Sequence, residues 1–207
     1  MDIELEIARG FGRARTLRCV VNFAGGMETH CRTRMTFFNK PNHVGALEPD
    51  SEPLSRQVAT LLTASGLDTE HAADIRRYVW EKVILNAGLS PLCALTCQLM
   101  RQAMTLPQTR ALVRDILHEG IAVAAADGCD FPPGYHDFCM GYLEKAGMHK
   151  PSMLVDVEAR RQTEIAYITA KIVEYGERYD IPTPVNHTIS RLIQGVDSVR
   201  DRARWAP

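Results

Sequence analysis

Three polar side chains stand at a regular spacing inside a strongly apolar segment, residues 79–95. Lys82, Asn86 and Ser90 recur every four residues, and at about 100° per residue they share one strip of roughly 80° on a helix. A buried lysine is costly unless it faces a cleft or a partner. The strip therefore predicts an ammonium, an amide and a hydroxyl along one side of a cleft. The alternative is that Lys82 extends to solvent and that Asn86 is a hydrogen-bonded core amide.

A second group of chemically capable residues lies between His149 and Ile168. If this segment is helical, Glu164 lies within about 40° of Ile168, which belongs to the core-facing arc. A carboxylate on the core side must be paired, hydrogen-bonded or protonated. The pattern predicts an inward acid, which belongs either to a site or to a structural ion pair. The candidate partners for that ion pair are Arg160, Arg161 and Lys82.

Helical periodicity dominates the chain from residue 48 onward and must position both groups. The expected helices cover residues 52–65, 74–95, 107–128, 132–147, 152–179 and 186–204. Gly66 is placed as the stop of the first helix, and Pro91 interrupts the second. Ser152 is placed as the N-cap of the fifth helix, a role that by itself would explain a serine there.

The first 47 residues show a different residue pattern, in which β-branched and aromatic runs alternate with turn residues. Strands are expected at 16–23, 29–38 and 43–47, the first of them ended by the sequence at 24–26. Three strands make a poor domain by themselves, so they are expected to form the edge of a sheet. The predicted fold class is mainly α, a helical bundle over 48–207, preceded by a short β-rich segment over 1–47.

Composition excludes several classes of protein. The net charge of −1 argues against a nucleic-acid binder, which needs a basic excess. No apolar stretch reaches the length of a membrane span. The start, MDIELEIARG, resembles neither a signal nor a transit peptide, so a cytoplasmic location is expected.

The cysteine and glycine patterns predict neither a metal site nor a nucleotide site. The six cysteines are spread thinly, and they are predicted to be small buried hydrophobes rather than a disulfide framework. Cys93 and Cys97 lack a nearby histidine or second cysteine pair, so no metal site is expected. Gly10 and Gly12 begin like a dinucleotide fingerprint, but the third glycine is missing and no strand precedes them.

A series of short motifs runs along the chain from residue 82 to residue 186. They are Lys82, Asn86, Ser90-Pro91-Leu92, Ala94-Leu95, Lys150-Pro151-Ser152-Met153-Leu154, Asp156, Thr163-Glu164-Ile165, Gly176, Ile181-Pro182-Thr183-Pro184 and Asn186. In this order and at this spacing, the motifs resemble the 2-dehydropantoate 2-reductase (ketopantoate reductase) family over essentially the whole chain. The interval of twelve residues from Ser152 to Glu164 is the most specific part of the resemblance.

The resemblance implies an NADPH-dependent reduction of the 2-keto group of ketopantoate to pantoate, in pantothenate synthesis. It also implies a Rossmann domain followed by a helical domain like the carboxy-terminal one of 6-phosphogluconate dehydrogenase. By resemblance, Lys82 is the general acid and Glu164 binds the substrate hydroxyl and positions Lys82. Asn86 and Ser152 bind substrate, and Ser90 and His149 occupy further substrate-binding positions.

The chain also departs from the family. Ser90 and His149 stand where asparagine is frequent, and Met100 stands where a polar contact is common, so related 2-keto acids are alternative substrates. No counterpart of the glycine-rich NADPH loop is found, so residues 1–47 resemble only the end of the nucleotide-binding domain. Without that loop, the 207-residue chain is expected to be inactive alone. It is also expected to form a homo-oligomer, a dimer. The alternatives are a non-catalytic helical module for dimerisation or small-acid binding, and a protein-interaction domain.

Overall fold

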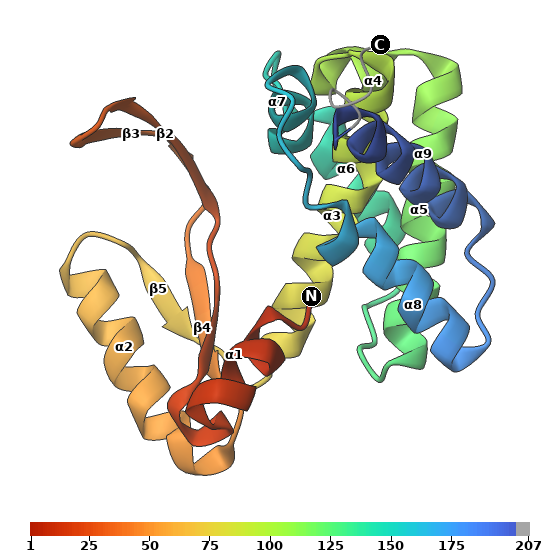
Figure 1. The fold of residues 1–207 in the computed structure, drawn as a ribbon. Coiled ribbons are helices and arrows are strands. Elements are labelled where there is room, and N and C mark those ends of the chain that lie inside the picture. The colour runs from red at the N-terminus through yellow and green to blue at the C-terminus, as the bar shows by residue number, and fades with distance from the viewer. Residues whose placement is uncertain (202–207) are drawn as a thin grey trace. The chain divides into compact units, whose positions relative to one another are not determined.

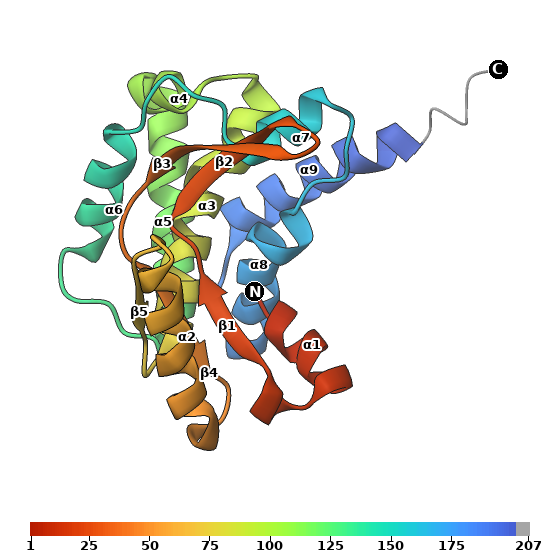
Figure 2. The ribbon, with the colours of Figure 1, turned by 90° about the vertical axis from the view of Figure 1, so that its left-hand side faces the viewer.

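The computed structural model describes residues 1–201, which form two compact units (Figures 1 and 2). One unit comprises residues 2–79, and the other comprises residue 1 and the chain from residue 80 onward. The division lies within helix α3 (Ile75–Thr96). None of the helices in the described part of the chain is long and apolar enough to cross a bilayer.

The unit of residues 2–79 contains a small mixed sheet with strand order β1-β4-β5. Strand β4 pairs antiparallel with β1 and parallel with β5, and helix α2 packs on β4 and β5. The hairpin β2–β3 extends beyond this sheet (Figure 1). The elements are α1 (Ile3–Phe11), η1 (Arg13–Arg15), β1 (Leu17–Val20), β2 (Phe23–Thr29), β3 (Arg32–Phe38), β4 (Asn42–Ala46), η2 (Pro49–Ser51), α2 (Glu52–Ala64) and β5 (Thr69–His71).

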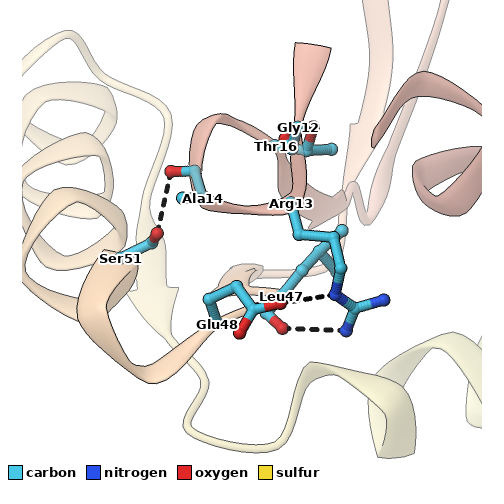
Figure 3. A network of polar contacts seen from close by, with 7 residues as sticks. All are labelled: Gly12, Arg13, Ala14, Thr16, Leu47, Glu48 and Ser51. Atoms are coloured by element: carbon cyan, nitrogen blue, oxygen red, sulfur yellow. Dashed lines mark hydrogen bonds and ion pairs between the residues drawn. The ribbon is translucent and has the colours of Figure 1, made fainter. Parts of the chain in front are cut away.

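A polar network joins the turn after α1 to the turn before α2 (Figure 3). Arg13 pairs with Glu48 and donates from Nη2 to the carbonyl of Leu47 at 3.1 Å. Ser51 donates its hydroxyl to the carbonyl of Ala14 at 2.8 Å. The short 3-10 segments η1 and η2 are thereby held against each other at one end of the sheet.

The expected single strand over 16–23 is wrong, because β1 ends at Val20 and β2 begins at Phe23. The glycine pair at 25–26 does not end a strand, because Gly25 and Gly26 lie inside β2 and pair with Met35 and Arg34. The three-residue strand β5 was not expected at all. Its pairing with β4 is what makes the small sheet mixed.

The second unit is a helical bundle, and the mainly helical fold class is confirmed. Helix α5 is central to it and contacts α4, α6, α8 and α9. The elements that follow α3 are α4 (Met100–Thr105), α5 (Pro107–Ala126), α6 (Tyr135–Glu144), α7 (Ser152–Glu158), η3 (Ile165–Tyr167), α8 (Thr169–Tyr179) and α9 (Pro184–Asp201).

Two glycines bring α3 and α5 close together. A Cβ atom added to Gly88 of α3 would lie 2.9 Å from a methyl carbon of Leu117 on α5. One added to Gly120 of α5 would lie 3.3 Å from Ile84 of α3 and 3.4 Å from Ile172 of α8. Larger side chains at either position would force the helices apart.

A buried carboxylate from α5 caps the amino-terminal end of α9. Glu119 accepts hydrogen bonds from the backbone amides of Val185 and Asn186, both at 2.9 Å, and from the Asn186 side-chain amide at 2.7 Å. The same Asn186 amide also donates to the carbonyl of Ile116 at 3.1 Å. Negative charge at a helix amino terminus is favourable, and here it also satisfies donors that have no partner within the helix.

Helix boundaries follow the sequence prediction in part. The stop of α2 at Gly66, with φ +90°, is confirmed, as are α3 and α5. The interruption at Pro91 is wrong, because α3 continues through it. The single helix over 152–179 is also wrong: Arg160 has φ +54°, and the chain leaves the helical conformation until η3 and α8. The predicted end of the last helix at 204 lies outside the described residues.

We predict that Glu119→Ala destabilises the chain by about 2–4 kcal/mol, because buried donors at the start of α9 lose their acceptor. Urea unfolding followed by circular dichroism measures this loss. Glu177→Ala, which removes an exposed carboxylate from α8, is the matched control and should change stability by less than about 0.5 kcal/mol. Equal effects of the two substitutions would contradict the capping role.

We predict that His43 makes stability depend on pH. The ring is nearly buried on β4 and stacks on Tyr78 with centroids 3.6 Å apart. Burial lowers the pKa of His43, and the charge of Glu70 on the neighbouring strand partly opposes that shift. The unfolded chain therefore takes up the proton first as the pH falls below about 6.5. The stabilisation is complete above that pH and is lost towards the lower pKa of the folded state.

The measurement is the urea midpoint at pH 7.5 and 5.5. His43→Phe keeps a ring beside Tyr78 and should reduce the difference between the two midpoints, whereas His30→Asn, at an exposed position, should leave it unchanged. A difference unaffected by His43→Phe would show that other groups cause it.

Candidate functional site

The strip of Lys82, Asn86 and Ser90 lies on α3 as predicted. Lys82 and Asn86 are half-buried, and Ser90 is 7% exposed. From the helical period, the strip faces about 180° away from Ile84 and Gly88, the residues that meet α5. The first and last side chains are separated by about 12 Å along the helix axis. The close packing on α5 therefore directs the polar strip to the opposite side of α3.

The segment before α7 is tied to the start of α4. The amide of Met100 donates to the carbonyl of His149 at 3.2 Å, which places the backbones of these two distant positions side by side. The side chain of His149 is exposed, and the neighbouring Met148 is 57% exposed. Lys150 is held by Glu158 of α7, with Nζ–Oε1 at 2.8 Å.

Ser152 is the first residue of α7 and is exposed. The expectation that it caps the helix is wrong, because Pro151 occupies the N-cap position. Proline fits there, since its ring fixes its own φ near the observed −68° and its missing N–H leaves no donor without a partner ahead of the helix. The Ser152 hydroxyl is therefore placed at the surface at the beginning of α7.

Glu164 is exposed, so the expectation of an inward carboxylate is wrong. The wheel argument assumed one continuous helix, whereas Glu164 lies just before η3, outside α8. The preceding residue fixes its position: Thr163 is buried and donates its hydroxyl to Asp197 of α9 at 2.6 Å. The approach of Glu164 to Lys82 stays a prediction.

Trp80 lies two residues before Lys82 and is fully buried. Its indole N–H donates to Asp127 at 2.8 Å, and the hydroxyl of Tyr179 donates to the other oxygen of Asp127 at 2.6 Å. Asp127 follows the last turn of α5. The carboxylate thus links α3, α5 and α8.

The side chains described here form no group suited to a metal ion. Burial raises the pKa of the Cys93 thiol to about 12 and that of Cys139 to about 11, so neither is a ready thiolate ligand. The prediction of buried cysteines holds for three of the six. Cys93, Cys129 and Cys139 are buried, and Cys19, Cys31 and Cys97 are exposed.

The segment of Gly10 and Gly12 does not form a loop suited to the pyrophosphate of a dinucleotide. Gly12 ends helix α1 and is followed by the 3-10 segment η1. A phosphate-binding loop would instead leave a strand and open a helix, whose amides hold the phosphates. The sequence-based rejection of this fingerprint agrees with that geometry.

A separate shallow cavity of about 570 Å³ lies between the end of α8 and the start of α9 and contains none of the predicted site residues. The cavity is lined by Val173, Gly176, Glu177, Asp180, Ile181, Pro182, Thr183, Pro184 and His187.

The sequence analysis missed three carboxylates that support the helices, Asp127, Glu119 and Asp197. Their hydrogen-bond partners are distant in sequence, so the only available signal was an acidic residue beside a helix end.

Comparison with known proteins adds a family match. A family model described as the carboxy-terminal part of ketopantoate reductase PanE/ApbA matches residues 74–197, more than half of the chain. A 2-dehydropantoate 2-reductase of Archaeoglobus fulgidus is 28% identical over 156 residues, which are 75% of this chain and 52% of that protein. The chain thus spans about half the length of this curated relative.

Solved structures share the fold. A D-mandelate dehydrogenase with NADH and anilino(oxo)acetate superposes with a TM-score of 0.83 at 21% identity, covering 95% of this chain and 65% of that one. A dimeric ketopantoate reductase from Staphylococcus aureus gives a TM-score of 0.77 at 24% identity, covering 89% and 62%.

We predict that Asp127→Ala costs about 1–3 kcal/mol, because the buried Trp80 N–H loses its acceptor. Tyr179→Phe removes the partly exposed partner of the same carboxylate and should cost less than about 1 kcal/mol. Urea unfolding of both variants measures the difference, and the near-ultraviolet dichroism of Trp80 should change only in Asp127→Ala. Equal losses of stability would contradict a special role for the indole contact.

Proposed function

Because the chain belongs to the ketopantoate reductase family, we propose that it is the substrate-binding part of an NADPH-dependent enzyme that reduces a small 2-keto acid. The observation that carries the proposal is the strip of Lys82, Asn86 and Ser90 on the side of α3 that points away from α5.

The chemistry explains why a lysine is needed. Reduction of a keto group builds negative charge on its oxygen, and a cationic proton donor within about 3 Å stabilises that charge and supplies the proton. We assign this role to Lys82 Nζ. Asn86 would orient the substrate or the Lys82 ammonium by hydrogen bonding, and Ser90 would extend the same polar strip.

The remaining residues would hold the rest of the substrate. Ser152 would bind near the substrate carboxylate, and Glu164 would accept a hydrogen bond from the substrate hydroxyl and help to position Lys82. The exposure of both side chains leaves them accessible to a ligand. His149 would contribute from the segment that is tied to α4 through Met100.

Ketopantoate is the proposed substrate, and 2-keto acids with other side chains are the alternative. The observation that favours the alternative is Met100, which brings a thioether rather than a polar group beside the backbone of His149. The fold neighbour with anilino(oxo)acetate, a 2-oxo carboxylate that carries an aromatic anilino group, accords with such a range.

The cofactor, the assembly and the location are proposals as well. NADPH would be held mainly by a nucleotide-binding part that corresponds to the additional length of the relatives. We also propose that the chain forms a homodimer, as a dimeric neighbour suggests. The cytoplasm is the proposed location.

Calorimetric titration of the 207-residue chain with ketopantoate tests the site. We predict that Lys82→Met weakens binding at least about tenfold, because a charge-assisted hydrogen bond is lost. Lys40→Met removes an exposed lysine whose pair with Asp68 spans 3.8 Å, and binding should stay unchanged. Fluorescence titration should detect no micromolar binding of NADPH.

Three outcomes would contradict the proposal. Absence of ketopantoate binding at millimolar concentration, or equal binding by Lys82→Met, would remove the substrate site. Tight NADPH binding would contradict the poor fit of the cofactor. Phenylglyoxylate, titrated in parallel, distinguishes the two substrate classes.

A further inference from the structure

Helix α6 has an outward face that its own unit leaves uncovered. Its inward face packs in the bundle through four buried side chains, at positions 135, 139, 140 and 143. The opposite side includes Asp137, Phe138, Gly141 and Tyr142, and Lys145 follows as the C-cap residue of the helix; these five residues are here called the α6 ridge. From the helical period, Gly141 lies almost opposite the centre of the buried face.

The ridge is apolar and aromatic at its centre. Phe138 is 56% exposed and Tyr142 is 43% exposed. The two rings stack with centroids 6.5 Å apart, and Phe138 also stacks on the buried Tyr135 at 5.8 Å. Rings held by such contacts lose little conformational entropy when another surface covers them.

Gly141 has no explanation within its own chain. Glycine is a poor helix former, and a Cβ atom added here would have no heavy atom within 4 Å. Gly88 and Gly120 differ, because each is required by a neighbouring helix of the bundle. A helix from another molecule that crosses at Gly141 would require a residue without a Cβ atom there, as the neighbouring helices do at Gly88 and Gly120.

The charges on the ridge are symmetric about the glycine. Asp137 lies four residues before Gly141, and Lys145 lies four residues after it, so all three follow one line along the helix. An antiparallel copy of α6 centred on Gly141 would place each Asp137 opposite a Lys145. A two-fold axis requires this kind of self-complementarity.

We propose that two copies of this chain associate through their α6 ridges, packed antiparallel around a two-fold axis at Gly141. Phe138 and Tyr142 form the apolar centre, and two Asp137–Lys145 pairs close the ends. This inference rests on the proposed homodimer and assigns its surface. It does not depend on the reductase activity.

Helix α9 offers the competing surface. Gly195 also has open space around it, and Leu192 and Val199 beside it are 51% and 62% exposed. The residues four before and four after Gly195 are Arg191 and Val199, so a two-fold axis there would leave an arginine opposite a valine. Charge complementarity therefore favours α6.

The first experiment compares Gly141→Arg with Gly195→Arg in the 207-residue chain, by sedimentation velocity over 1–200 µM. Either arginine replaces a helical glycine whose added Cβ atom would meet no heavy atom within 4 Å, so both variants should keep or raise the melting temperature. Gly141→Arg should raise the dimer dissociation constant by about a hundredfold or more, because a long side chain fills the crossing point. Gly195→Arg should leave the constant unchanged.

The second experiment uses charge reversal. Asp137→Lys and Lys145→Asp should each weaken association by about tenfold, because each places like charges at both ends of the interface. The double variant restores opposite charges and should bind within a few-fold of the original chain. Such rescue would not occur if the single variants only disturbed folding.

Each alternative outcome overturns the proposal. A chain that is monomeric at 200 µM would exclude both the proposed homodimer and its surface. A dimer blocked by Gly195→Arg but not by Gly141→Arg would move the interface to α9. A dimer unaffected by all of these variants would retain self-association and exclude both helices. Loss of dimer in the double variant would exclude the Asp137–Lys145 pairing.

Discussion

The close approach of α3 to α5 is the constraint on which the candidate site depends. Gly88 and Gly120 allow the two helices to meet through Leu117 and Ile84, and this contact fixes the rotation of α3 about its axis. Lys82 faces the opposite direction because the helical period leaves no other choice. A lysine in a nearly all-apolar helix is thus kept away from the densest part of the core, where its charge would be most costly.

Three carboxylates then fix the irregular parts of the helical unit. Glu119 holds the beginning of α9, Asp127 joins the end of α5 to α3 and α8, and Asp197 holds Thr163 beside Glu164. Each binds donors from a segment far away in sequence. Periodic apolar packing positions the helices, and these charge-assisted hydrogen bonds position the connections between them. The placement of Glu164 therefore depends on Asp197 rather than on a helical face.

The sequence predicted the long periodic helices and missed the irregular segments, for physical reasons. The continuous apolar run over α3 and the apolar periodicity over α5 both reflect burial directly, so both helices could be predicted from them. The same approach wrongly predicted one helix between Ser152 and Tyr179. The positive φ of Arg160 and the hydrogen bond from Thr163 to Asp197 end that helix, and neither changes the periodicity of the sequence. The residue types of the candidate site were visible in the sequence, but the exposure of Glu164 was not.

The packing also links the two functional surfaces that we propose. A Cβ atom added to Gly88 would meet Leu143 of α6 at 3.4 Å as well as Leu117 of α5. Gly88 stands between Asn86 and Ser90 in the sequence, and Leu143 stands two residues after Gly141. The buried side of α6 therefore supports the helix that carries the polar strip, while its outward side is available to a second copy. A shift of α6 on association would be transmitted to α3 through direct contact, because close-packed side chains leave little space to absorb it.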